Sequence, residues 1–195
     1  MELIRAFIAI EPPHEVREQI AELVSQLRKL LRFSRVKWVE PHNLHLTLKF
    51  MAEVEEDVAR EGLRRLRVSM SPDLKSFPLT LKGLGVFPSW RAPRVIWIGV
   101  DRESHEEMRR IATALDRSYE SLGVASEDRE FKAHLTLGRV KGRMTQKDLD
   151  VLRHYKDKLG NSLTTFTANE LVLFKSTLTP SGPIYEALDR LTLER

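Results

Sequence analysis

One tetrapeptide with the side chains for chemistry occurs twice in this chain. His-Leu-Thr-Leu stands at His45–Leu48 and again, 89 positions later, at His134–Leu137. Because successive side chains of a strand point to opposite faces, the histidine and threonine of each copy share one face and the leucines share the other. Each segment therefore presents an imidazole and a hydroxyl on one side and anchors itself in a core on the other. Two such segments facing each other would form a cleft suited to chemistry on a phosphate.

The doubling separates this pattern from ordinary strand composition. A single His-x-Thr on a half-exposed strand is common, but the chain holds only six histidines in 195 residues. The other four carry no partner signal: His105 and His154 lie in charged helical stretches, and His14 and His42 each follow a proline. His42 is near enough to the first tetrad to line the rim of its site, although a plain loop position is the favoured interpretation.

The two tetrads and their surroundings resemble the two-histidine (2H) phosphoesterase superfamily. Within it the chain is most similar to the prokaryotic RNA 2′,3′-cyclic phosphodiesterases, often called 2′-5′ RNA ligases. The resemblance covers nearly the whole chain, including Arg5–Ile10, Leu44–Phe50, Phe131–Val140 and Leu171–Tyr185. It implies two lobes related by a pseudo-twofold axis, each lending one tetrad strand to a central cleft. Residues 1–195 would then form a single bilobal catalytic domain.

The tetrad side chains match the chemistry that the resemblance implies. A cyclic phosphodiester opens by in-line attack of water, and histidine suits both the base and the acid role because its usual pKa of about 6.5 is close to working pH. His45 and His134 are the expected catalytic pair. Thr47 and Thr136 can donate hydrogen bonds to the non-bridging oxygens, where charge develops.

The resemblance also specifies the substrate and the cofactors. It implies that RNA or oligonucleotide ends with a 2′,3′-cyclic phosphate lose the 3′-oxygen and become 2′-phosphates, without a metal or any other cofactor. The sequence agrees, because neither tetrad contains a carboxylate and two histidines alone seldom make a zinc site.

Further substrate contacts are expected beside the tetrads. Arg139 lies five residues after His134, so a regular strand would turn it to the opposite face. The family's second motif often carries an arginine that reaches the phosphate, which would require a bulge or the end of the strand near Gly138. Three aromatic side chains are candidates for stacking on a terminal base, with core packing as the alternative for each: Phe7, Phe50 and Phe131.

Composition excludes several other classes of protein. The absence of cysteine excludes disulfides and thiolate metal sites. Arg5 interrupts an N-terminal apolar run that is already too short for a signal peptide, and nothing approaches the length of a membrane span. We therefore expect a cytoplasmic protein with no membrane partner, acting as a monomer.

The net charge of the chain is only +4, but its positive charges are clustered. Basic residues gather in three stretches, Arg28–Lys37, Arg60–Arg67 and Lys132–Arg143. The first two are expected to be mostly solvated surface. The third brackets the second tetrad and should add positive potential at the cleft.

The spacing of apolar residues predicts an α+β fold with antiparallel sheets and no linker. Four amphipathic helices are expected, at His14–Arg32, Glu55–Val68, Arg102–Leu122 and Thr145–Leu159. Eight strands are expected, with a hairpin at the fourth and fifth: Arg5–Ile10, Val36–Val39, His45–Phe50, Phe77–Val86, Arg94–Val100, Phe131–Val140, Ala168–Ser176 and Ile184–Leu193.

Two other functions fit the same residues. An RNA ligase would join a 2′,3′-cyclic phosphate to a 5′-hydroxyl through the same cleft run backwards, and assays with both substrates separate the two activities. A non-catalytic RNA-binding module would hold phosphate without turnover. The presence of both histidines argues against this module.

Overall fold

The computed structural model describes residues 3–127 and 129–195. Four α-helices and a short 3₁₀ helix form in this part of the chain: α1 (His14–Leu30), α2 (Glu56–Met70), α3 (Arg102–Glu120), α4 (Gln146–Lys158) and η1 (Pro41–Asn43). The strands are β1 (Leu3–Ile10), β2 (Arg35–Trp38), β3 (Leu46–Glu55), β4 (Phe77–Phe87), β5 (Val95–Val100), β6 (Leu135–Lys141), β7 (Ser162–Ala168), β8 (Glu170–Thr179) and β9 (Gly182–Thr192).

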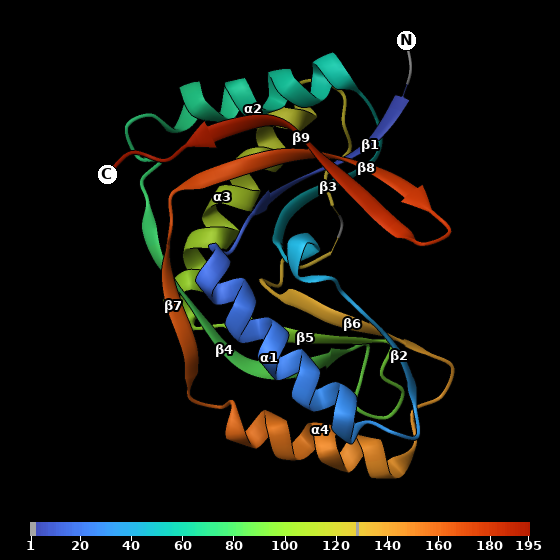
Figure 1. The fold of residues 1–195 in the computed structure, drawn as a ribbon. Coiled ribbons are helices and arrows are strands. Elements are labelled where there is room, and N and C mark those ends of the chain that lie inside the picture. Colours follow the sequence, from blue (N-terminus) through green and yellow to red (C-terminus); the bar gives the residue numbers. More distant parts are fainter. Residues whose placement is uncertain (1–2, 128) are drawn as a thin grey trace.

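The strands form one antiparallel sheet that separates into two lobes. Its order is β7-β4-β5-β6-β3-β1-β8-β9, with β2 added beside β6. The ladder between β3 and β6 joins Leu46 to Leu135, and farther along β6 pairs with β2 instead. In Figure 1 the upper lobe holds β9, β8, β1 and β3, and the lower lobe holds β2, β6, β5, β4 and β7. The expected two-lobed, antiparallel α+β fold is confirmed.

Each lobe is assembled from both halves of the chain. β8, from the second half, pairs with β1 in the upper lobe, and β4, from the first half, pairs with β5 in the lower lobe. The helices are exchanged in the same way. α3 packs on α2 and β3, whereas α1 lies beside α4, whose Tyr155 hydroxyl donates to the side chain of Gln26 on α1 at 3.3 Å. Each lobe therefore depends on the other half of the chain for part of its core.

The helices follow the apolar pattern of the sequence. Each end of the four expected helices lies within two residues of its predicted position. The buried stripe of α1 repeats at helical spacing and consists of Val16, Ile20, Leu23, Val24 and Leu27. None of the helices within residues 3–127 and 129–195 combines the length and apolar character needed to cross a membrane.

Three predicted strands need correction. The expected strand His45–Phe50 is too short at its end, because β3 continues to Glu55. β6 begins at Leu135, so the expected strand Phe131–Val140 is too long at its start. The expected strand Ala168–Ser176 proves to be parts of two strands, β7 and β8, which meet at Asn169. β7 escaped prediction because it is an edge strand rich in serine and threonine, in which only Phe166 and Ala168 are buried.

Candidate active site

A cavity of about 770 Å³ opens between the lobes, where β3 and β6 separate. Both tetrad histidines line it, one from each lobe. Seven of the eight site residues expected from the sequence lie in its wall: His45, His134, Thr47, Thr136, Arg139, Phe7 and Phe50. The cleft therefore brings together two segments that are far apart in the sequence.

The main chain holds the two histidine rings in the same way. Nδ1 of His45 lies 2.7 Å from the carbonyl oxygen of Asn43, and Nδ1 of His134 lies 2.7 Å from that of Lys132. Because a carbonyl oxygen can only accept, Nδ1 is the donor and carries a proton in both rings. Nε2 is then the nitrogen of each ring that remains for proton transfer.

Aromatic side chains form a wall behind each histidine. The ring of His45 lies 4.7 Å from that of Phe7 and 5.3 Å from that of Tyr185, centre to centre. The ring of His134 meets Phe87 edge-on at 5.0 Å. Phe7 is only 4% exposed and also stacks on Phe174, so it packs behind the ring of His45.

Burial lowers the pKa of both imidazoles below its usual value of 6.5. In each ring the hydrogen bond to the carbonyl acts in the opposite direction, because it favours the protonated form. The positive charge of Arg139 lowers the pKa of both rings, and protonation of His134 lowers the pKa of His45 further. The two histidines therefore belong to one electrostatic site.

A one-residue bulge in β6 decides where Arg139 points. Thr136 is paired with Trp97 and Gly138 with the neighbouring Ile96, so Leu137 is the extra residue on β6. Beyond this extra residue, the alternation of side chains between the two faces of the strand is shifted by one position. Arg139 therefore lies on the cleft face with Thr136. The bulge that Arg139 needs in order to face the cleft is therefore present in β6.

β3 carries the same bulge at the same place in its tetrad. Thr47 is paired with Ala9 and Lys49 with the neighbouring Ile8, so the residue between them, Leu48, is the extra one. As a result Phe50 lines the cleft at the position that Arg139 occupies in the other strand.

A family model for LigT-like phosphoesterases matches the chain twice, over residues 10–97 and 98–185. Each match contains one tetrad and the bulged strand that carries it. The chain belongs to the LigT-like phosphoesterase family. The double match agrees with the pseudo-twofold relation of the lobes.

Curated relatives of this LigT-like phosphoesterase cover nearly its whole length. It is 39% identical over 186 residues to the RNA 2′,3′-cyclic phosphodiesterase of Archaeoglobus fulgidus, covering 95% of this chain and 98% of that one. The RNA 2′,3′-cyclic phosphodiesterase of Methanocaldococcus jannaschii gives the same identity and coverage.

Solved structures share the fold. The crystal structure of the Thermus thermophilus protein TT0787 is 28% identical, with a TM-score of 0.78, and the match covers 97% of this chain and 98% of that one. The structure of Escherichia coli LigT complexed with 3′-AMP is 26% identical, with a TM-score of 0.75, over 100% of both chains.

One expected site residue of this LigT-like phosphoesterase lies elsewhere. The ring of Phe131 packs on that of His105 at 5.9 Å, and its carbonyl oxygen lies 3.3 Å from Nε2 of the same histidine. Phe131 also packs against the main core. The structure thus corrects the expectation of base stacking by Phe131, because the chain reaches the cleft only beyond it, at His134.

Tyr185 is a cleft residue that sequence reasoning missed. It comes from β9, and its ring meets both His45 and Phe7 edge-on. Burial raises the pKa of its phenol, while the charges of Arg139 and Arg5 act in the opposite direction. No local pattern marks Tyr185, because only the long-range pairing of β1 with β8 brings the hairpin of β8 and β9 to the site.

The turn between β8 and β9 closes one side of the cleft. The Lys37 ammonium on β2 donates to the carbonyl of Ser181 at 3.4 Å. The Asn43 side-chain amide donates to the carbonyl of Pro183 at 3.3 Å. These two contacts tie the turn to the segment that leads into the first tetrad.

Proposed function

We propose that this protein hydrolyses the terminal 2′,3′-cyclic phosphate of RNA to a 2′-phosphate by metal-independent acid–base catalysis. His45 and His134 are the acid–base pair. The observation that carries the proposal is their matched geometry: each Nδ1 is fixed by a carbonyl, which leaves one Nε2 from each lobe for the reaction. The relatives' names, which specify RNA 2′,3′-cyclic phosphodiesterases, support the substrate class.

The geometry suits an in-line displacement. A neutral imidazole from one lobe takes a proton from water as the water oxygen bonds to phosphorus. The bond from phosphorus to the 3′-oxygen breaks, and the protonated imidazole of the other lobe gives its proton to that oxygen. The products are a 2′-phosphate and a free 3′-hydroxyl.

The rest of the cleft suits an anionic substrate. Thr47 and Thr136 lie beside the histidines and supply hydroxyl donors for the non-bridging oxygens, and Arg139 supplies positive charge. In the free protein both histidines have a lowered pKa, so both are largely neutral at pH 7. A bound phosphodiester anion raises the pKa of the ring that it approaches, so the substrate itself helps to create the acid.

The deciding experiment is hydrolysis of a nucleoside 2′,3′-cyclic phosphate after exhaustive treatment with EDTA, with the product isomer identified by phosphorus NMR. We expect undiminished turnover and a 2′-phosphate. Activity that is lost on chelation and restored only by zinc or manganese would replace this mechanism with a metal hydrolase. A 3′-phosphate product would show that the substrate binds the other way round.

A second assay tests the ligase alternative. RNA fragments with a 2′,3′-cyclic phosphate and with a 5′-hydroxyl are supplied together, and joined and hydrolysed products are counted. We expect hydrolysis to dominate. Predominant joining would make the protein a ligase that uses the same cleft.

A further inference from the structure

Four cationic side chains stand on one face of the ladder between β2 and β6. Arg35 is paired with Lys141, and Lys37 is paired with Arg139. All four are exposed, whereas the residues that alternate with them face the core. We call this set the basic ladder. Three of its members, Lys37, Arg139 and Lys141, line the cleft, and Arg35 continues the same face outward.

The basic ladder is unfavourable for the fold itself. Like charges placed directly opposite each other on neighbouring strands destabilise a sheet. In the part of the chain that the structure describes, none of its four members forms an ion pair. The arginines of the helices differ, since several pair with a glutamate one turn away, as Arg65 does with Glu61. The positive charge of the basic ladder is therefore not compensated within the fold, and it favours binding of an anionic ligand beside the cleft.

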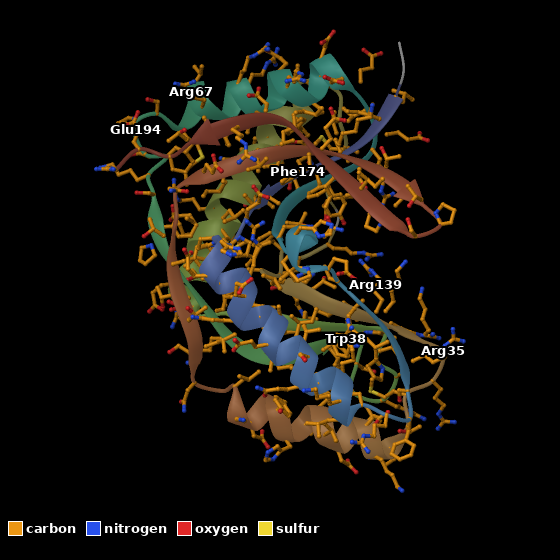
Figure 2. The ribbon with its side chains drawn as sticks, in the orientation of Figure 1. Arg35, Trp38, Arg67, Arg139, Phe174 and Glu194 are labelled. Atoms are coloured by element: carbon orange, nitrogen blue, oxygen red, sulfur yellow. The ribbon has the colours of Figure 1, made fainter. Side chains whose placement is uncertain are left out.

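The basic ladder leads away from the reacting groups. Arg139 lies at the opening between the lobes, and Arg35 lies farther out, at the rim of the lower lobe (Figure 2). Residues two apart on a strand are about 7 Å apart, a spacing close to that of successive phosphates in an extended nucleic-acid strand. The ladder thus has the charge and the repeat of a track for a single-stranded polyanion.

We propose that the basic ladder binds the phosphates of the RNA chain on the 5′ side of the cyclic end. This inference rests on the proposed function, because a 2′,3′-cyclic phosphate is the 3′ end of its strand and the chain can leave the cleft only in the 5′ direction. The preferred substrate is then an oligonucleotide of several nucleotides, and a mononucleotide uses the reacting groups without the ladder.

The first test compares substrates of increasing length, from a nucleoside 2′,3′-cyclic phosphate to a hexanucleotide with the same end. We expect kcat/KM to rise as 5′ phosphates are added. We also expect salt to matter more for longer substrates. In a plot of log kcat/KM against log salt concentration, the slope should become more negative by about 0.7 for each added phosphate that is bound. Equal kcat/KM and equal salt dependence at all lengths would overturn the proposal.

The second test uses Arg35→Gln, which removes the ladder member that lies outside the cleft lining. We expect a several-fold lower kcat/KM for the hexanucleotide and a salt slope shallower by about 0.7, with mononucleotide turnover unchanged. The melting temperature should stay the same or rise, because the variant removes a like-charge pair. Arg67→Gln is the matched control, since Arg67 is exposed on α2 at the far end of the upper lobe (Figure 2).

An Arg35→Gln variant that behaves like Arg67→Gln on the hexanucleotide would overturn the basic ladder as a binding track. A failure of the proposed function has a different signature, in which the wild-type protein hydrolyses neither substrate. In that case fluorescence anisotropy with a 2′-phosphate-ended hexanucleotide still decides the matter. Weaker binding by Arg35→Gln than by Arg67→Gln supports the ladder, and equal binding overturns it.

Discussion

In each of the two histidine rings, Nδ1 holds the ring in place and Nε2 remains for proton transfer. Nδ1 of each ring is bonded to the carbonyl two residues earlier, so the main chain sets the ring orientation before any substrate arrives. We expect His45→Ala and His134→Ala each to lower kcat about 10²–10⁴-fold, the usual share of one acid or base. Turnover of a nucleoside 2′,3′-cyclic phosphate measures the loss, and circular dichroism verifies the fold. Near-wild-type turnover by either variant would refute the two-histidine mechanism.

Arg139 acts on both histidines, and in the proposed function it also contacts the phosphate of the substrate. Its charge lowers the pKa of both His45 and His134, so its removal should raise both values. We expect Arg139→Gln to lower kcat/KM about 10–100-fold, as for loss of a charged hydrogen bond. The optimum of its pH profile should move to higher pH. Arg139→Lys keeps the charge and should leave the profile nearly in place. An unshifted profile in Arg139→Gln would mean that its charge does not act on the histidines.

The bulges are the decisive feature at the scale of single elements. In β3 the slip that brings Phe50 to the cleft also sends Lys49 into the interior, where it is 2% exposed. Its ammonium lies 2.5 Å from a carboxylate oxygen of Asp116 on α3. The ion pair compensates for a charge that the bulge buries, and it ties the first tetrad strand to the helix behind it.

This pair makes a stability prediction. Asp116→Asn leaves a buried ammonium without a counter-charge and should lower the free energy of unfolding by about 1–3 kcal/mol. The loss stays below that of a fully buried pair because Asp116 is 30% exposed. Urea denaturation measures it. Arg109→Gln, which breaks an exposed pair with Glu106, serves as the control and should change little. Equal stability of Asp116→Asn and wild type would show that the pair does not anchor β3.

At the scale of the whole molecule, the site exists only because two lobes meet. One histidine comes from each lobe, and each lobe borrows strands from the other half of the chain. This exchange supports the hypothesis that residues 1–195 act as a single catalytic domain. That hypothesis stays a prediction, as do the monomeric state and the cytoplasmic location.

The joint site has a predictable pH dependence. Catalysis needs one protonated and one neutral imidazole, so kcat/KM should be bell-shaped, with macroscopic pKa values that belong to the pair. Since the pKa of each histidine is lowered from 6.5 in the free protein, the optimum of kcat/KM should lie below pH 6.5. A profile of kcat/KM from about pH 4 to 9 tests this. A rate that rises steadily to high pH would contradict paired acid–base catalysis.

Local patterns in the sequence were enough to predict the helices and the shared face of histidine and threonine in each tetrad. Apolar periodicity placed the four helices, and strand alternation placed Thr47 and Thr136 on one face with their leucines on the other. These features are local, because the direction of a side chain within a regular element depends only on its near neighbours.

The other side chains that line the cleft with the histidines depend on how distant segments of the chain pair. Arg139 reaches the cleft through a bulge that depends on the register of β6 against β5. Tyr185 arrives because β1 pairs with β8, which carries the hairpin of β8 and β9 to the site. Arg35 and Lys141 became one charged face only when β2 paired with β6, although they belong to separate basic stretches of the chain. Register and strand pairing are set by contacts between distant segments, and no local pattern contains them.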